Sequence, residues 1–167
     1  MILFHGSYLK VPAPDVKRGR AAVDFGQGFY LTQFQEQASI WALVVSNRYR
    51  GATPTLNSYE FDVDLAKAIA GTRYKVFASY DLEWLNYVVD CRKRGGLQAE
   101  YDVVEGGVAN DNVIDTVELY ENGDITAEQA LGQLAYKKVN HQLTILNQAI
   151  IDSCLHFVGS EEVRHAP

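Results

Sequence analysis

The feature of this sequence that most constrains its fold is a change of hydrophobic period between residues 29 and 63. Residues 29–32 are β-favouring, whereas apolar residues from 33 to about 49 recur at helical spacing. Residues 57–63 then alternate apolar and polar positions, which is typical of a half-buried strand. The sequence therefore predicts a strand, a helix and a strand in direct succession.

The remaining elements mix strands and helices without the regular alternation that builds a parallel sheet. Asp81 is a candidate helix cap, and Thr126 with Gln129 has the spacing of a capping box. Further strands are predicted at residues 1–7, 101–104, 142–146 and 154–158, helices at 81–94 and 126–136, and a turn or short helix between the last two strands. This order predicts one α+β domain over residues 1–167, with a mainly antiparallel sheet.

Composition narrows the class of protein. Apolar residues make up 47% of the 167 and charged residues 22%, which predicts a soluble, folded chain. The net charge of −6 argues against nucleic-acid capture over the whole surface, although it does not exclude a local basic stripe. The two dense basic clusters, residues 17–20 and 92–94, are of a kind that more often forms solvated turns and helix ends.

Several common site types lack their sequence signatures. Cys91 and Cys154 lie far apart without zinc or redox spacing, so buried free thiols are predicted. The four histidines show no metal-binding spacing, and no nucleotide-binding glycine loop or zinc-protease motif is present. Because no stretch has the length of a membrane span and the start has no secretion signal, we expect a cytoplasmic protein without a metal or membrane contact.

Two short motifs remain as candidates for chemistry. Residues 4–7 read FHGS at the end of a strand, and residues 24–30 read DFGQGFY, where two glycines allow close backbone approach. Trp41 follows Tyr30 by eleven residues, so the two aromatic side chains could face each other across a flat ring. Each residue also has an ordinary explanation, as a strand-end histidine, a turn glycine or a core aromatic.

In order and spacing, FHGS, FGQGFYLT and QASIWA resemble the successive motifs of diphtheria-toxin-like and poly(ADP-ribose)-polymerase-like ADP-ribosyltransferases. They are still more similar to an uncharacterised family of small bacterial proteins placed in that superfamily. The resemblance implies the split two-sheet antiparallel α+β core of ADP-ribosyltransferases with flanking helices. It also implies that NAD is the substrate and that no other cofactor is needed.

The resemblance implies a role for each matching residue. His5 would bond a ribose hydroxyl of NAD, Gly6 would present its backbone amide and carbonyl to the nicotinamide carboxamide, and Ser7 would lie beside the adenosine ribose. Tyr30 and Trp41 would sandwich the nicotinamide ring. Gly28 and Phe29 would line the NAD pocket. Arg20 and Arg18 could reach the pyrophosphate of NAD, although a solvated loop explains the two arginines slightly better.

Two departures from the family pattern concern catalysis. Ala38 occupies the position of a serine that bonds the carboxamide in many relatives, and Gln142 occupies that of the third catalytic residue, a glutamate. An amide can orient the ribose but cannot stabilise the positive charge that develops as the glycosidic bond breaks. Losing such an electrostatic partner costs about 3–4 kcal/mol of barrier. Glu105, with Asp111 behind it, is the candidate replacement carboxylate.

Three functions follow from the resemblance. The first is an ADP-ribosyltransferase or NAD glycohydrolase, whose macromolecular acceptor is a protein or a nucleic acid. The second is a catalytically weak NAD- or ADP-ribose-binding module that acts through a protein partner, which Gln142 favours. The third is removal of a phosphate from RNA with NAD as co-substrate, and it fits least well because the chain has a net negative charge and no basic groove. Small bacterial relatives are often toxin-like, so an antagonist protein is an expected partner.

Overall fold

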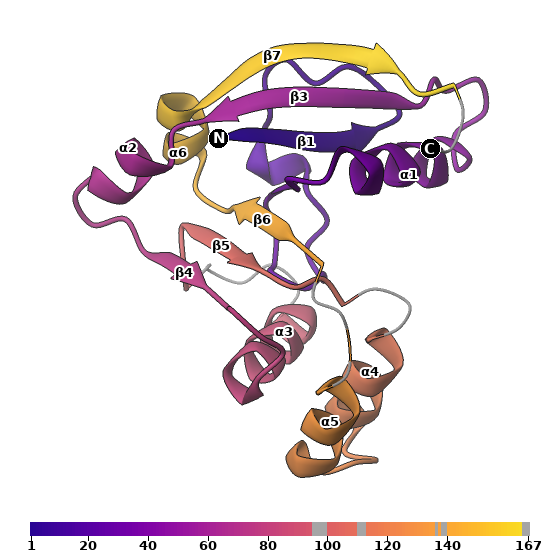
Figure 1. The fold of residues 1–167 in the computed structure, drawn as a ribbon, viewed down its shortest axis with the longest axis vertical. Helices are drawn as coiled ribbons and strands as arrows, with labels where there is room; N and C mark the ends of the chain where they lie inside the picture. Colours follow the sequence, from indigo (N-terminus) through magenta and orange to yellow (C-terminus); the bar gives the residue numbers. More distant parts are fainter. Residues whose placement is uncertain (95–99, 110–112, 136, 138–139, 165–167) are drawn as a thin grey trace.

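The computed structural model describes residues 1–167 except 95–99, 110–112, 136, 138–139 and 165–167, and shows an α+β fold with two sheets (Figure 1). The first sheet has the order β1 (Ile2–Ser7), β3 (Thr55–Phe61), β7 (Leu155–Glu162). The second has the order β2 (Phe29–Leu31), β6 (Gln142–Ile145), β5 (Val103–Gly106), β4 (Tyr74–Val76). Within the described strands, β4 and β5 pair in parallel and the other pairs are antiparallel.

Helices flank the sheets on several sides. They are the 3-10 turn η1 (Val16–Arg18), α1 (Gln35–Ser46), α2 (Val63–Ala68), α3 (Leu82–Arg94), α4 (Ile114–Asn122), α5 (Ala127–Leu134) and α6 (Gln148–Cys154). Helix α1 lies along β1, whereas α3, α4 and α5 gather beyond the second sheet (Figure 1). No helix within the described ranges is both long and apolar enough to cross a bilayer.

Two hydrophobic clusters hold the layers together. One joins the two sheets through residues such as Leu3, Tyr59 and Leu143, each 0% exposed. The other packs the opposite face of the second sheet against the helices, with Trp84 and Val104 also 0% exposed. Full burial of one such side chain contributes roughly 1.5–3 kcal/mol, so both faces of the second sheet are firmly anchored.

A single β-bridge links the edges of the two sheets. Phe4 N–H donates to the Thr32 carbonyl at 2.8 Å, and Thr32 N–H donates back to Phe4 at 3.0 Å. No ladder continues from this bridge, so β1 and β2 separate beyond it. The separation comes directly after Phe4, at His5 and Gly6.

The structure confirms most of the predicted elements. Asp81 Oδ1 accepts from Trp84 N–H at 2.9 Å, as a helix cap does. Thr126 and Gln129 form the predicted capping box, and the helix that follows ends at Leu134. The predicted end of this helix at residue 136 lies outside the described residues.

Other predictions are corrected. Residue 63 was expected to end a strand but begins α2, because the Asp62 side chain accepts from Leu65 N–H and caps a helix there. Two of the apolar residues that recur at helical spacing do not face the core: Phe34, which precedes α1, is 52% exposed, and Trp41 within α1 is 41% exposed. Periodicity did not predict β4 or α4. Within the described residues the two cysteines form no disulfide; Cys154 is buried, as predicted, whereas Cys91 is partly exposed.

Candidate functional site

Gly6 allows α1 to lie directly on β1. A β-carbon at Gly6 would stand 2.0 Å from the Ala38 carbonyl oxygen and 2.7 Å from the Ala42 nitrogen. Both are backbone atoms of a helix, which cannot give way as a flexible side chain can. The glycine predicted for close approach to a ligand is therefore also required for packing.

The backbone of Gly6 faces the opening between β1 and β2. Phe4 directs its N–H and C=O to Thr32, and alternate residues of a strand direct these groups to the same side. The N–H and C=O of Gly6 therefore point away from β3, towards β2. Among the described residues, none of β2 bonds them. A buried donor and a buried acceptor are thus left available on one residue.

His5 is held beside this opening in a defined tautomer. Its Nδ1 lies 2.8 Å from the Tyr30 carbonyl oxygen, and its ring centre lies 4.5 Å from that of Phe29. A carbonyl only accepts, so Nδ1 carries the proton. Burial lowers the pKa of the His5 imidazole more than the bond to Tyr30 raises it. Near neutral pH the ring is therefore uncharged, with Nε2 as a hydrogen-bond acceptor.

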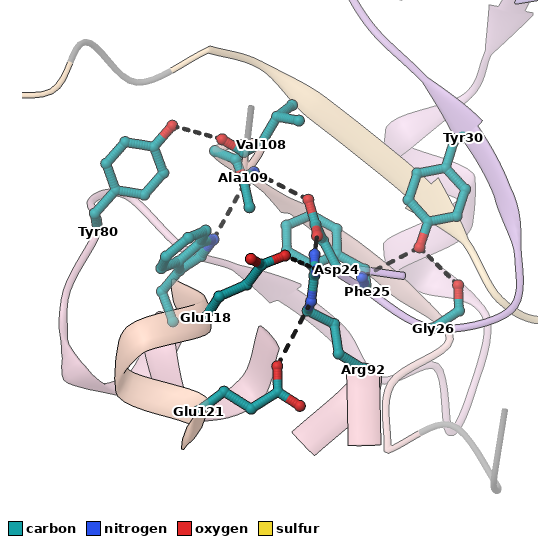
Figure 2. A network of polar contacts seen from close by, with 12 residues as sticks. Asp24, Phe25, Gly26, Tyr30, Tyr80, Arg92, Val108, Ala109, Glu118 and Glu121 are labelled. Carbon is teal, nitrogen blue, oxygen red and sulfur yellow. Dashed lines mark hydrogen bonds and ion pairs between the residues drawn. The ribbon is translucent and has the colours of Figure 1, made fainter. Parts of the chain in front are cut away.

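The Tyr30 side chain fastens the preceding turn. Its hydroxyl donates to the Gly26 carbonyl at 2.6 Å and accepts from Phe25 N–H at 3.1 Å (Figure 2). Burial raises the pKa of this phenol, which therefore stays protonated. The ring packs against the cluster beneath the second sheet. Tyr30 thus fixes the segment that carries the FGQG motif.

Close backbone contacts fold residues 17–28 back on themselves. Gly26 has φ +84°, and a β-carbon at Gly28 would stand 2.7 Å from the Ile145 carbonyl oxygen. A β-carbon at Gly19 would stand 2.3 Å from the Gly28 carbonyl oxygen. The Gln27 amide donates to the carbonyls of Lys17 and Gly19, each at 2.9 Å. The loop is thereby fixed beside β2 and β6.

A polar network ties this loop to α3 and to the segment after β5. Asp24 accepts from Arg92 at 3.0 Å and from Ala109 N–H at 2.9 Å (Figure 2). Burial raises the pKa of the Asp24 carboxyl, against the lowering effect of these two donors. Arg92 also lies 3.5 Å from Glu118 and 3.9 Å from Glu121, both on α4. The network therefore joins four segments behind Tyr30.

Gln142 lies on the same sheet face as Tyr30. Tyr30 pairs directly with Thr144, and Gln142 precedes Thr144 by two residues, so all three side chains share one face. Gln142 Nε2 and Thr144 Oγ1 are buried and have no hydrogen-bond partner in the part of the chain that the structure describes. Two polar atoms are thus oriented to this face with bonding capacity unused.

The structure does not bring Glu105 together with Gln142. Glu105 pairs with Leu143, so its side chain occupies the opposite face of the sheet. Its oxygens accept from Tyr74 and pair with His141 Nε2, each at 3.0 Å. The bond to His141 lowers the pKa of Glu105 more than burial raises it. The other candidate carboxylate, residue 111, lies outside the described residues.

Trp41 lies on the outer side of α1, close to two arginines. The Cζ atoms of Arg20 and Arg48 stand 6.0 and 5.4 Å from its ring centre. Trp41 and Tyr30 form no ring contact with each other in the described structure. Ser7 is 7% exposed, and Arg18 is exposed in η1.

Comparison with known proteins identifies a family. The family profile described as "Protein of unknown function (DUF3990)" matches residues 1–157. The chain belongs to this family. No curated protein and no solved structure matches it. The DUF3990 match spans all the candidate residues above, from His5 to Gln142.

Sequence reasoning missed one central residue of this DUF3990 chain. His141 accepts from Gln33 N–H at 3.1 Å through Nδ1 and pairs with Glu105 through Nε2. It thereby links the start of α1 to β5. The spacing of His141 from the other histidines bears only on metal binding, and no local sequence pattern signals such a long-range contact. The described residues hold no group of three or more His, Cys, Asp or Glu suited to a metal ion.

Proposed function

We propose that this chain has an ADP-ribosyltransferase-like fold and binds NAD where β1 and β2 separate. The observation that supports this proposal most directly is that no described residue hydrogen-bonds the amide or the carbonyl of Gly6. A carboxamide offers one acceptor oxygen and an amino donor, which complement a backbone N–H and C=O on one residue. Nicotinamide ends in such a group.

His5 and Gln142 supply polar contacts for the sugar. In the neutral imidazole, Nε2 accepts a bond from a ribose hydroxyl, while Nδ1 remains fixed by Tyr30. We assign the Gln142 amide, whose Nε2 has no hydrogen-bond partner among the described residues, to the same ribose. Trp41, which is 41% exposed on the helix that packs against Gly6, is the aromatic surface we assign to the nicotinamide ring. The contacts together hold nicotinamide and its ribose.

The proposed reaction breaks the bond between the nicotinamide nitrogen and the anomeric carbon. Nicotinamide leaves as a neutral molecule with the bonding electron pair, and an acceptor or water attacks the anomeric carbon and loses a proton. Gln142 orients the sugar but adds no negative charge, so the barrier exceeds that of a site with a carboxylate by about 3–4 kcal/mol. The proposed reaction is therefore slow.

The same observation on Gln142 favours a second candidate, an NAD- or ADP-ribose-binding module that acts through a protein partner. One assay separates the two. The protein is incubated with NAD labelled on the adenylate, and released nicotinamide and label on macromolecules are measured beside NAD binding. Transfer or hydrolysis supports the enzyme, whereas bound and intact NAD supports the module.

Matched variants assign the activity to this site. His5→Ala and Trp41→Ala are expected to weaken NAD binding at least tenfold, whereas Val158→Ala, at a position 62% exposed on β7, is expected to leave it unchanged. Absence of NAD binding in the folded wild-type protein would overturn both candidates.

A further inference from the structure

A group of aromatic and arginine side chains covers the end of α1 beside the candidate site. Arg20 and Arg48 stand over the ring of Trp41, and Tyr49 stacks on Tyr8 at 4.2 Å with 25° between the rings. Trp41 is 41% and Tyr49 50% exposed. We call these five residues the aromatic–arginine patch.

The arginines of the patch form no close ion pair among the described residues, although Arg20 acts on Asp24 at longer range and opposes the rise in the pKa of that carboxyl. No described carboxylate lies within 4.0 Å of Arg20 or Arg48 as an ion pair, whereas Arg73 and Arg92 are paired with Asp102 and Asp24. The chain as a whole carries −6, so two unpaired arginines on one exposed tryptophan form a local exception. Lys17 and Arg18, close to Arg20 in the chain, are also exposed.

This combination points to a ligand that is both planar and anionic. Exposed aromatic rings and guanidinium planes stack on unpaired bases, and arginines contact the phosphates between them. A duplex hides its base faces, whereas a single strand presents them. We propose that the aromatic–arginine patch binds single-stranded nucleic acid.

The patch adjoins the proposed NAD site. Tyr8 follows Gly6 by two residues, and Trp41 directly precedes Ala42, whose nitrogen contacts the Gly6 position. A strand bound here lies next to the ribose that loses nicotinamide. The nucleic acid would therefore be the acceptor of ADP-ribose; this role rests on the proposed function, whereas binding to the patch does not.

The test is a fluorescence titration with a labelled twelve-nucleotide single strand, as DNA and as RNA, without NAD. Each phosphate contact contributes a slope of about −0.7 to log K against log salt, so two arginines predict about −1.4. Arg48→Gln should reduce the slope to about −0.7, and Tyr49→Ala should weaken binding about 5- to 100-fold. Lys137→Gln, at an exposed lysine that follows α5, and Tyr49→Phe are the matched controls.

Two results would overturn the proposal. One is that a duplex or a poly-glutamate peptide binds with the same affinity as the single strand and that Tyr49→Ala has no effect. The patch would then recognise negative charge alone. The other is absence of saturable single-strand binding by the folded protein. Nicotinamide release is measured on the same Tyr49 variants and should be unchanged. Loss of strand binding with intact nicotinamide release, or the reverse, thus separates this proposal from the proposed function.

Discussion

Replacing Gln142 by methionine should stabilise the protein while weakening NAD binding. Gln142 Nε2 is buried with no hydrogen-bond partner among the described residues, and an unsatisfied buried polar group lowers the free energy of unfolding by about 1–3 kcal/mol. Methionine has similar length and no polar atom, so Gln142→Met removes this cost and should add about 1 kcal/mol to the free energy of unfolding. For a chain of 167 residues this raises Tm by about 2–4 °C.

The assay is thermal and urea unfolding of wild type and Gln142→Met, with NAD binding measured on the same samples. Gln35→Met, at an exposed glutamine on α1, is the control and should change the free energy of unfolding by less than about 0.5 kcal/mol. Destabilisation of Gln142→Met by more than about 1 kcal/mol would refute the reasoning, because the amide would then have an internal role.

Three further predictions concern other residues of the candidate site. Gly6→Ala should lower the free energy of unfolding in urea by at least about 3 kcal/mol, because its β-carbon meets the Ala38 carbonyl. The control Gly132→Ala, with open space around it, should raise this free energy by about 0.5–1 kcal/mol, and equal effects of the two variants would contradict the reasoning. The His5 pKa is lowered on folding, so the unfolded state binds more protons below pH 6.5, and the free energy of unfolding should fall there by up to about 1.4 kcal/mol per pH unit. His5→Gln should remove this slope, and a slope retained in the variant would assign it to other groups. Tyr30→Phe removes both bonds of the hydroxyl and should cost about 1–3 kcal/mol in chemical unfolding, and a change below about 0.5 kcal/mol would show that these bonds do not hold the turn.

Local signals account for the elements that were predicted correctly. The Thr126 capping box and the Asp81 cap are satisfied within three residues, so the sequence determines them. Strand β4 has three residues and depends on pairing with β5, a contact that leaves no local pattern. The α2 start was missed because an alternating pattern continued through Val63 while Asp62 capped a helix.

The sequence singled out His5 and Gly6 as candidate site residues, but distant contacts define their geometry. Helix α1 packs on Gly6, and the Tyr30 carbonyl sets the tautomer of His5. The face occupied by Glu105 depends on strand register, and a shift of one residue would move it to the side of Gln142. The exposure of Trp41 likewise depends on how α1 is rotated on β1, which spacing alone does not determine.

The most direct test of the proposed NAD site is the backbone amide of Gly6, followed by nuclear magnetic resonance during titration with NAD. The account predicts a saturable shift of the Gly6 resonance with NAD, none at Gly132, and little at Gly6 with ADP-ribose, which lacks nicotinamide. A Gly6 resonance unmoved at saturating NAD, or moved equally by ADP-ribose, would contradict the account.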